Sequence, residues 1–333
     1  MPIPALLQQR LAVPAIGAPM FLVSFPPLVR ALCLAGVVGT FPHVNARPSS
    51  QLDAWLGALR RDLDAHTAAH PDALVAPFGV NLVCHPSNPR FRPDLDIVVQ
   101  HRVPLVLTSL GHPRPVVEAV HAYGGLVFSD IVRTDHARKA IEAGVDGLIC
   151  VGGGAGGHAS DQSAFSLVHE VRRFWSGCLV LGGGINDGHQ IRAAETLGAD
   201  LAYIGTRFNA TLESHADPAF KQMIVDSGVH DLVYTDRFTG VPANFLRPSI
   251  TRFGIDVAKL PPKRPDIASI ADSEAKAWRD FWSAGHGVAT IDDIPPVAEL
   301  VARMAAEYRA ACGLPPSAAC RQRPVPAAAT EAA

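Results

Sequence analysis

One histidine and a glycine-rich stretch before it are the residues best suited to chemistry in this chain. Gly152 to Gly157 places five glycines in six residues, and His158 follows directly. An imidazole can take up a proton near neutral pH or donate a hydrogen bond to a developing anion. Glycines at these positions would let the backbone approach a flat ring of a ligand. The alternative is that the glycines only make a flexible loop. We therefore take His158 as the candidate catalytic residue.

A second glycine cluster has the pattern of a phosphate site. Gly182 to Gly188 reads GGGINDG, three glycines followed by the start of a helix. Free N–H groups and the helix dipole at such a position favour an anion, although a tight turn is the alternative. Gly205 to Arg207 follows the next apolar run and could add N–H donors and a hydroxyl. Together the two sets predict a phosphate-bearing cofactor.

The elements around these clusters read as a parallel sheet. Three short apolar runs, Leu148 to Val151, Cys178 to Leu181 and Leu201 to Ile204, each end in glycine, as buried parallel strands do. Ala164 to Phe174 and Gln190 to Leu197 lie between them and carry apolar residues at helical spacing. Strand, helix and strand in this order predict crossover connections.

The rest of the chain continues the alternation. Further strands are expected at 11–16, 37–40, 78–82, 104–108 and 126–129, and helices at 27–34, 50–67, 95–100, 115–123 and 134–143. Eight alternations favour a (β/α)8 TIM barrel, with a doubly wound open sheet as the rival. The barrel is preferred because the glycines follow strands six to eight and no GxGxxG follows strand one.

The pattern changes after Phe208. We expect residues 1–208 and 286–313 to form the barrel, 209–285 to be a helical insertion or lid covering its mouth, and 314–333 to be a flexible tail. Helices are predicted at 218–226, 273–281 and 296–311. Trp282 to His286 is either core packing of the lid or a cover over the ligand.

Composition excludes several classes of protein. The 333 residues have a formal net charge of -2, which does not suggest a nucleic-acid binder. No apolar run reaches ~18 residues, so no membrane span is expected, and no secretory signal is evident. The six cysteines form no CxxC pair and suggest reduced thiols in a cytoplasmic protein. Five scattered histidines lack HxH or HExxH spacing, so no metal site is expected; they are His43, His85, His101, His112 and His136.

Five motifs carry a family resemblance. GGGAGGH, LGGGINDG, LGADLAYIGTRFNATLES, TDRFTGVPANFLR and FWSAG, in that order, resemble the nitronate monooxygenase family, also called 2-nitropropane dioxygenase-like. The APM at Ala18 to Met20 and the GVNL at Gly79 to Leu82 are similar to that family's motifs after its first strand and in its third. The resemblance spans about residues 18–285 and implies an FMN-dependent TIM barrel.

The resemblance implies a role for individual residues. His158 would be the active-site base or hydrogen-bond donor, and Ser283 and His286 would lie on the lid side of the substrate. The residues expected to bind FMN are Ala18, Pro19, Met20, Asn81, Asp130, Gly156, Gly157, Gly183, Gly184, Gly205 and Thr206. Three positions depart from the family pattern: Asp130 where a lysine is common, Val151 where a polar or acidic residue is common, and His286 where glutamine is common.

The expected activity is oxidation of small nitroalkanes or alkyl nitronates with O2, by a monomer or homodimer. An NAD(P)H:quinone reductase or an enoyl-thioester reductase on the same FMN barrel is the alternative, with NAD(P)H as a further partner. A third hypothesis is a barrel that binds a phosphate ligand without turnover.

Overall fold

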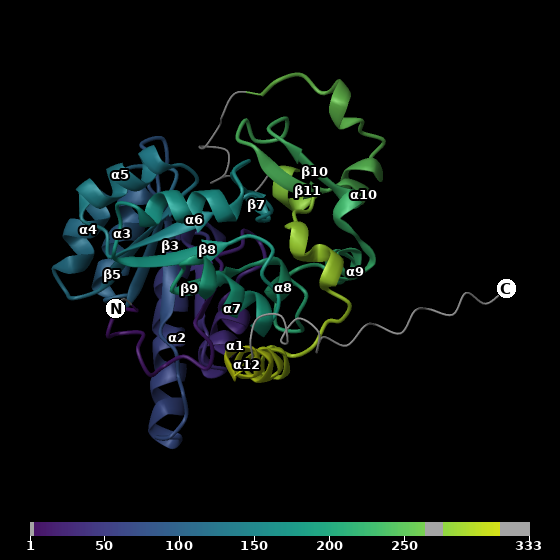
Figure 1. The fold of residues 1–333 in the computed structure, drawn as a ribbon. Helices are drawn as coiled ribbons and strands as arrows, with labels where there is room; N and C mark the ends of the chain where they lie inside the picture. The colour runs from purple at the N-terminus through teal and green to yellow at the C-terminus, as the bar shows by residue number, and fades with distance from the viewer. Residues whose placement is uncertain (1–2, 264–275, 314–333) are drawn as a thin grey trace.

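The computed structural model describes residues 3–263 and 276–313, and its centre is a closed barrel of eight parallel strands (Figure 1). The strand order around the barrel is β1-β2-β3-β4-β5-β6-β8-β9. The strands are β1 (Ala15–Gly17), β2 (Val38–Pro42), β3 (Phe78–Val83), β4 (Leu105–Ser109), β5 (Leu126–Ile131), β6 (Gly147–Val151), β8 (Cys178–Gly182) and β9 (Leu201–Ile204). The predicted TIM barrel is therefore confirmed, and the doubly wound sheet is wrong.

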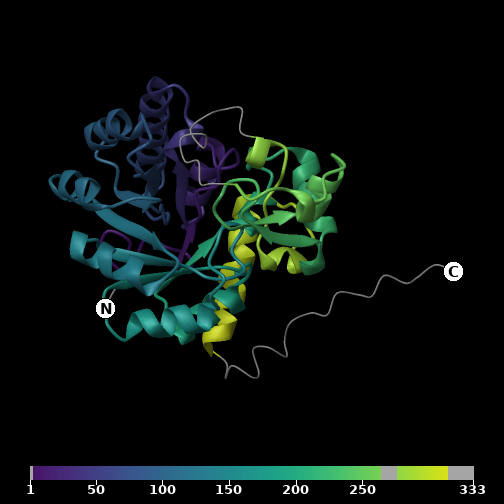
Figure 2. The ribbon, with the colours of Figure 1, turned by 90° about the horizontal axis from the view of Figure 1, so that it is seen from above.

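Helices surround the barrel, and Figure 2 shows them as an outer ring. They are α1 (Pro26–Leu34), α2 (Ser49–Ala69), α3 (Phe91–Gln100), α4 (Arg114–His121), α5 (Thr134–Ala143), α6 (Ala164–Arg172), α7 (Gly188–Leu197), α8 (Thr206–Asn209) and α12 (Val297–Gly313), with short 3-10 turns at His43–Asn45 and His286–Thr290. The helix α12 packs against α7 and α1 and completes the outer layer.

The core has two layers because successive strand side chains point to opposite faces. One buried cluster fills the barrel interior and includes Leu107, Phe128, Ile149 and Val180. The larger cluster lies between the outer strand faces and the helices, where Val127 is one of its members. This alternation decides which residues at the strand ends face the barrel mouth.

The described parts of the insertion, residues 209–263 and 276–285, lie together on one side of the barrel (Figures 1 and 2). The insertion contains the expected helices α9 (Pro218–Asp226) and α11 (Lys276–Arg279), together with α10 (Arg247–Thr251) and the 3-10 turns Val229–Asp231 and Val257–Lys259. It also contains a hairpin that the helical interpretation did not include, β10 (Leu232–Thr235) and β11 (Ala243–Leu246). Residues 273–275 of the predicted helix and the predicted tail 314–333 lie outside the described residues.

The hairpin is joined to the barrel through a two-residue strand, β7 (Gly157–His158), in a three-stranded sheet of order β10-β11-β7. The pairs are Ala243 with His158 and Asn244 with Gly157. The insertion therefore fixes the backbone of the candidate catalytic residue. In the part of the chain that the structure describes, no helix combines the length and apolar character needed to cross a bilayer.

Candidate active site

Polar side chains face the barrel interior where several strands end. Asn81 of β3 and Ser109 of β4 are hydrogen-bonded to each other, with the Asn81 Nδ2 atom 3.1 Å from the Ser109 Oγ atom. Asp130 of β5 shares the inward face of Phe128, and Tyr203 of β9 shares the inward face of Leu201, because both lie two residues further along their strands. The mouth of the barrel is thus polar, above an apolar interior.

The Asp130 carboxyl has an unusual environment. Its Oδ1 atom is buried and has no hydrogen-bond partner among the described residues. Burial raises the pKa of Asp130 to about 7, and no described cation offsets that rise. Burial also raises the pKa of the Tyr203 hydroxyl well above its ordinary value, with the Asp130 charge as a further cause. Both groups are therefore neutral over most of the acid and near-neutral range.

His158 lies in the loop after β6, held from the insertion side. Its ring meets the Trp278 ring edge-on, with the ring centroids 5.3 Å apart, and its Nε2 atom lies 3.4 Å from the Thr239 Oγ1 atom. Burial lowers the pKa of His158 to about 4, so the imidazole is neutral at pH 7.

The Thr239 hydroxyl indicates which ring nitrogen carries the proton. It donates a 2.8 Å hydrogen bond to the Val241 carbonyl, so it can only accept from His158. That direction favours the Nε2–H tautomer, which leaves Nδ1 of His158 with a free lone pair. Thr239 and Trp278 are thus positioning residues that the sequence analysis did not identify.

The glycine-rich turns after β8 and β9 present free amides. Gly183 and Gly184 have φ values of 126° and 71°, a conformation that side chains rarely adopt, and a Cβ on Gly183 would lie 3.3 Å from the Ala155 nitrogen. The backbone N–H groups of Gly183, Gly184, Gly205 and Thr206 have no acceptor within 3–263 and 276–313. Buried amides are normally paired, so a cluster of free ones is suited to an anion.

The segment from Ser283 to His286 contacts both the turn after β9 and the loop that carries His158. The Gly285 amide donates to the Thr206 Oγ1 atom at 2.9 Å, and the His286 amide donates to the Gly154 carbonyl at 2.8 Å. The His286 side chain is exposed, and its ring lies against Gly154. Because Thr206 Oγ1 accepts this hydrogen bond, its own proton remains available to another ligand.

Ser283 links this segment to the glycine-rich loop by hydrogen bonds. Its Oγ atom accepts a 2.6 Å hydrogen bond from the Gly157 amide and donates a 2.6 Å hydrogen bond to the Asn244 carbonyl. The Asn244 side chain donates in turn to the Ala155 carbonyl at 2.8 Å. The predicted lid residue Ser283 therefore ties the glycine loop to β11, and Gly156 lies between these contacts.

The ends of the first and last barrel strands meet beside the free amides. The Ala18 amide donates to the Ile204 carbonyl at 2.9 Å, and the Met20 amide donates to the Ser24 Oγ atom at 3.0 Å. A Cβ on Gly205 would lie 3.7 Å from both the Met20 sulfur and the Ala18 methyl carbon. The segment of Ala18, Pro19 and Met20 is thus adjacent to the β9 turn, whereas Asn81 lies on the third strand of the same mouth.

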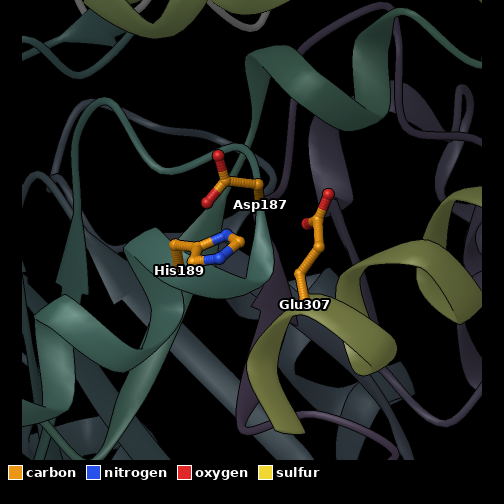
Figure 3. Close-up of side chains that lie close together, drawn as sticks. All are labelled: Asp187, His189 and Glu307. Carbon is orange, nitrogen blue, oxygen red and sulfur yellow. The ribbon is translucent and has the colours of Figure 1, made fainter. Parts of the chain in front are cut away.

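Figure 3 shows a separate group, Asp187, His189 and Glu307, between the start of α7 and α12. One potential ligand atom from each residue lies within 4.8 Å of the others. Both carboxylates act as caps, because Asp187 accepts from the Gln190 amide at 2.8 Å and Glu307 accepts from the Gly188 amide at 2.9 Å. The group was not noticed in the sequence, and the absence of a metal site stays a prediction.

The family is settled by comparison with known proteins. The sequence profile of nitronate monooxygenase matches residues 60–307. The chain belongs to the nitronate monooxygenase family. That family is named for an oxidoreductase activity, and the resemblance inferred from the five motifs is confirmed.

The relatives differ in their sequence identity to this chain and in the share of the chain that they match. A Mycobacterium tuberculosis protein provisionally named a monooxygenase is 36% identical over 169 residues, which is 50% of this chain and 45% of the relative. The chain thus spans about half the length of the first of the curated relatives it matches. A nitronate monooxygenase of Paraburkholderia phytofirmans is 26% identical over 344 residues, covering 89% of this chain and 92% of the relative.

Solved structures show the same fold. A nitroalkane oxidase from Streptomyces ansochromogenes superimposes with a TM-score of 0.77 and 26% identity, covering 93% of this chain and 99% of the other. FabK from Thermotoga maritima has a TM-score of 0.76 and 26% identity, covering 92% and 96%. The nitronate monooxygenase family member described here therefore shares almost its whole described fold with both.

Proposed function

We propose that the protein is an FMN-dependent nitronate monooxygenase that oxidises small alkyl nitronates with O2. The observation that carries the proposal is a cluster of four backbone amides without acceptors among the described residues, at the ends of β8 and β9, next to the glycine loop that leads to His158. The family membership and the likeness to a nitroalkane oxidase support it. A cytoplasmic location and a monomer or homodimer remain part of the same proposal.

The residues fit an FMN phosphate. Four amides without acceptors, at Gly183, Gly184, Gly205 and Thr206, supply donors, and the Thr206 hydroxyl can supply a fifth. A Cβ on Gly183 would press against the backbone of the loop after β6, at the Ala155 nitrogen, so the close approach of that loop to the amides needs a glycine here. Met20 lies next to the Gly205 turn and would contact the cofactor from the β1 side, whereas Asn81, Gly156 and Gly157 would lie nearer the ring or ribityl chain. A bound flavin would supply electron acceptance from the substrate and reactivity toward O2.

The properties of His158 favour a substrate that is already deprotonated. An imidazole whose pKa is about 4 is a weak base, so it has little driving force for removing a carbon-bound proton from a neutral nitroalkane. A nitronate needs no such transfer. The Nε2–H group of His158 is bound to Thr239, so a nitronate would meet the Nδ1 atom. That atom can donate a hydrogen bond to the nitronate only after it takes up a proton. The negative charge of the nitronate favours this protonation.

The first experiment is the visible spectrum of the purified protein, with FMN added if it is colourless. Anaerobic addition of an alkyl nitronate should bleach the flavin colour rapidly, and NADH or NADPH should bleach it slowly. A protein that stays colourless with FMN would refute the cofactor and leave the third hypothesis, a phosphate-binding barrel without turnover.

The histidine is tested by His158→Asn, with His169→Asn as the matched control because His169 is exposed on α6. With a neutral nitroalkane, whose carbon-bound proton has to be removed, His158→Asn should reduce turnover by about 10²–10⁴-fold if His158 is the general base, and the control should leave it unchanged. Equal turnover in both variants would contradict a catalytic role for His158.

A reductase is the second candidate, because one relative is named a carboxyl-CoA dehydrogenase and the fold is shared with FabK. In that case a bound flavin would supply hydride transfer between NAD(P)H and a quinone or an enoyl thioester. Rapid bleaching by NADH or NADPH, with no response to a nitronate, would favour this function over the first.

A further inference from the structure

Asp130 is a partly buried acid whose Oδ1 atom no contact within the described chain explains. Its side chain shares the inward face of β5 with Phe128, and the strand register places it beside Ile149 of β6. Its Oδ1 atom is buried without a hydrogen-bond partner among the described residues. It therefore lies at the mouth of the barrel, on the strand next to the one that leads to His158.

Asp94 shows how the same chain stabilises a buried carboxylate that has a structural role. Its Oδ2 atom lies 2.8 Å from the Arg90 guanidinium and 2.5 Å from the His43 ring. The Oδ1 atom of Asp94 also lacks a partner, so the difference is that no described cation or ring nitrogen lies against the Asp130 carboxyl. Burial of a carboxylate oxygen without a partner disfavours the charged form, so a neutral acid or a partner from outside the chain is favoured at this position.

The groups that share the surroundings of Asp130 are neutral as well. Tyr203 faces the same interior from β9, and Cys84 follows β3; the Asp130 charge helps to raise the pKa of each. Burial raises the pKa of Asp130 itself to about 7. A protonated carboxyl has one O–H to donate, and the buried Oδ1 atom of Asp130 has no hydrogen-bond partner among the described residues.

We propose that Asp130 is a neutral carboxylic acid that donates a hydrogen bond to an acceptor atom of the flavin ring. The inference rests on the proposed function, since the ring carbonyls and ring nitrogens of FMN are the acceptors that such a mouth would receive. A neutral donor differs from a cation at this place, because it polarises the ring without adding a charge. It also loses its donor when the carboxyl ionises.

Infrared spectroscopy of protein labelled with ¹³C at the aspartate carboxyl groups reports the acid directly. At about pH 6 we expect a carbonyl stretch of a protonated acid, absent in Asp130→Asn and retained in Asp64→Asn, whose exposed carboxyl on α2 is the matched control. Addition of FMN should shift this band. The absence of a protonated-acid band at about pH 6, or a band that FMN leaves unchanged, would overturn the inference.

FMN affinity gives a second readout that does not depend on turnover. At about pH 6, Asp130→Leu should bind FMN about tenfold more weakly, whereas Asp130→Asn, which keeps an N–H donor, should stay within about threefold of the wild type. The wild-type affinity should fall above about pH 7, and the affinity of Asp130→Asn should not. Equal affinities in the wild type and Asp130→Leu would overturn the inference alone; failure of every form to bind FMN would also refute the proposed function.

Discussion

Replacing Asp130 with asparagine should remove a loss of stability that the wild type has as the pH rises from about 4 to about 7. The pKa of the carboxyl is raised from 3.8 to about 7, so between these values the folded protein keeps a proton that the unfolded chain has lost. The contribution of this group to stability is therefore complete below about pH 4 and is lost as the pH rises through about 7. Asparagine does not ionise, so the variant does not have this loss.

The magnitude follows from the size of the pKa change. At 1.36 kcal/mol per pKa unit, a rise from 3.8 to about 7 corresponds to about 4 kcal/mol. The high effective dielectric of real protein sites reduces this, so we expect about 2–4 kcal/mol. The free energy of unfolding of Asp130→Asn, relative to the wild type, should rise by that amount between about pH 4 and pH 8.

Urea unfolding of flavin-free protein at a series of pH values measures this difference, because the other titrating groups are common to both proteins and cancel. Asp64→Asn provides the control, since its exposed carboxyl should give a constant difference. Parallel stability curves for the wild type and Asp130→Asn would show that the carboxyl is already ionised at low pH, and the account of Asp130 given above would fail.

Three further predictions test other parts of the site. Gly184→Ala should weaken FMN binding about tenfold or more. The control Gly124→Ala, at a similar φ of 81° in a turn before β5, should lower the stability without changing the FMN affinity. Equal FMN affinities in the two variants would contradict the proposed phosphate site. Thr239→Val should lower turnover several-fold and Thr239→Ser should restore it, because only the hydroxyl fixes the His158 tautomer; an equal loss in both would point to packing alone. Glu307→Ala should lower the free energy of unfolding by about 1 kcal/mol, because the α7 cap is lost. Addition of Zn²⁺ or Mn²⁺ to the wild type should not raise its melting temperature. A metal-dependent rise would show that Asp187, His189 and Glu307 form a metal site.

The barrel could be predicted because its signals are local. Buried parallel strands read as short apolar runs, so Leu201 to Ile204 was placed with the bounds that β9 has, and α5 was placed from Thr134 to Ala143. Most errors lie at the ends of elements: β1 begins at Ala15 rather than at Leu11, and α7 begins at Gly188 rather than at Gln190 because Asp187 caps it. The short helix α8 (Thr206–Asn209) was not predicted.

The missed parts of the site depend on pairings that are distant in sequence. The two residues of β7 have no strand pattern of their own and become a strand only because Ala243 and Asn244 pair with them. Thr239 and Trp278 reach His158 from the insertion, and no spacing in the sequence links them to it. Tyr203 could have been found, because strand alternation puts it on the inward face two residues after Leu201.

The two ionisable groups at the mouth constrain the chemistry together. Burial lowers the pKa of His158 to about 4 and raises that of Asp130 to about 7, so between these values the histidine is an unprotonated base and the aspartate is a protonated acid. The pKa of the histidine is thus below that of the aspartate, which is the reverse of the order for free side chains. A turnover that needs the protonated form of Asp130 should therefore fall as the pH rises through about 7. Asp130→Asn should remove only the alkaline limb; an alkaline limb that persists in this variant would assign it to another group and separate the two residues functionally.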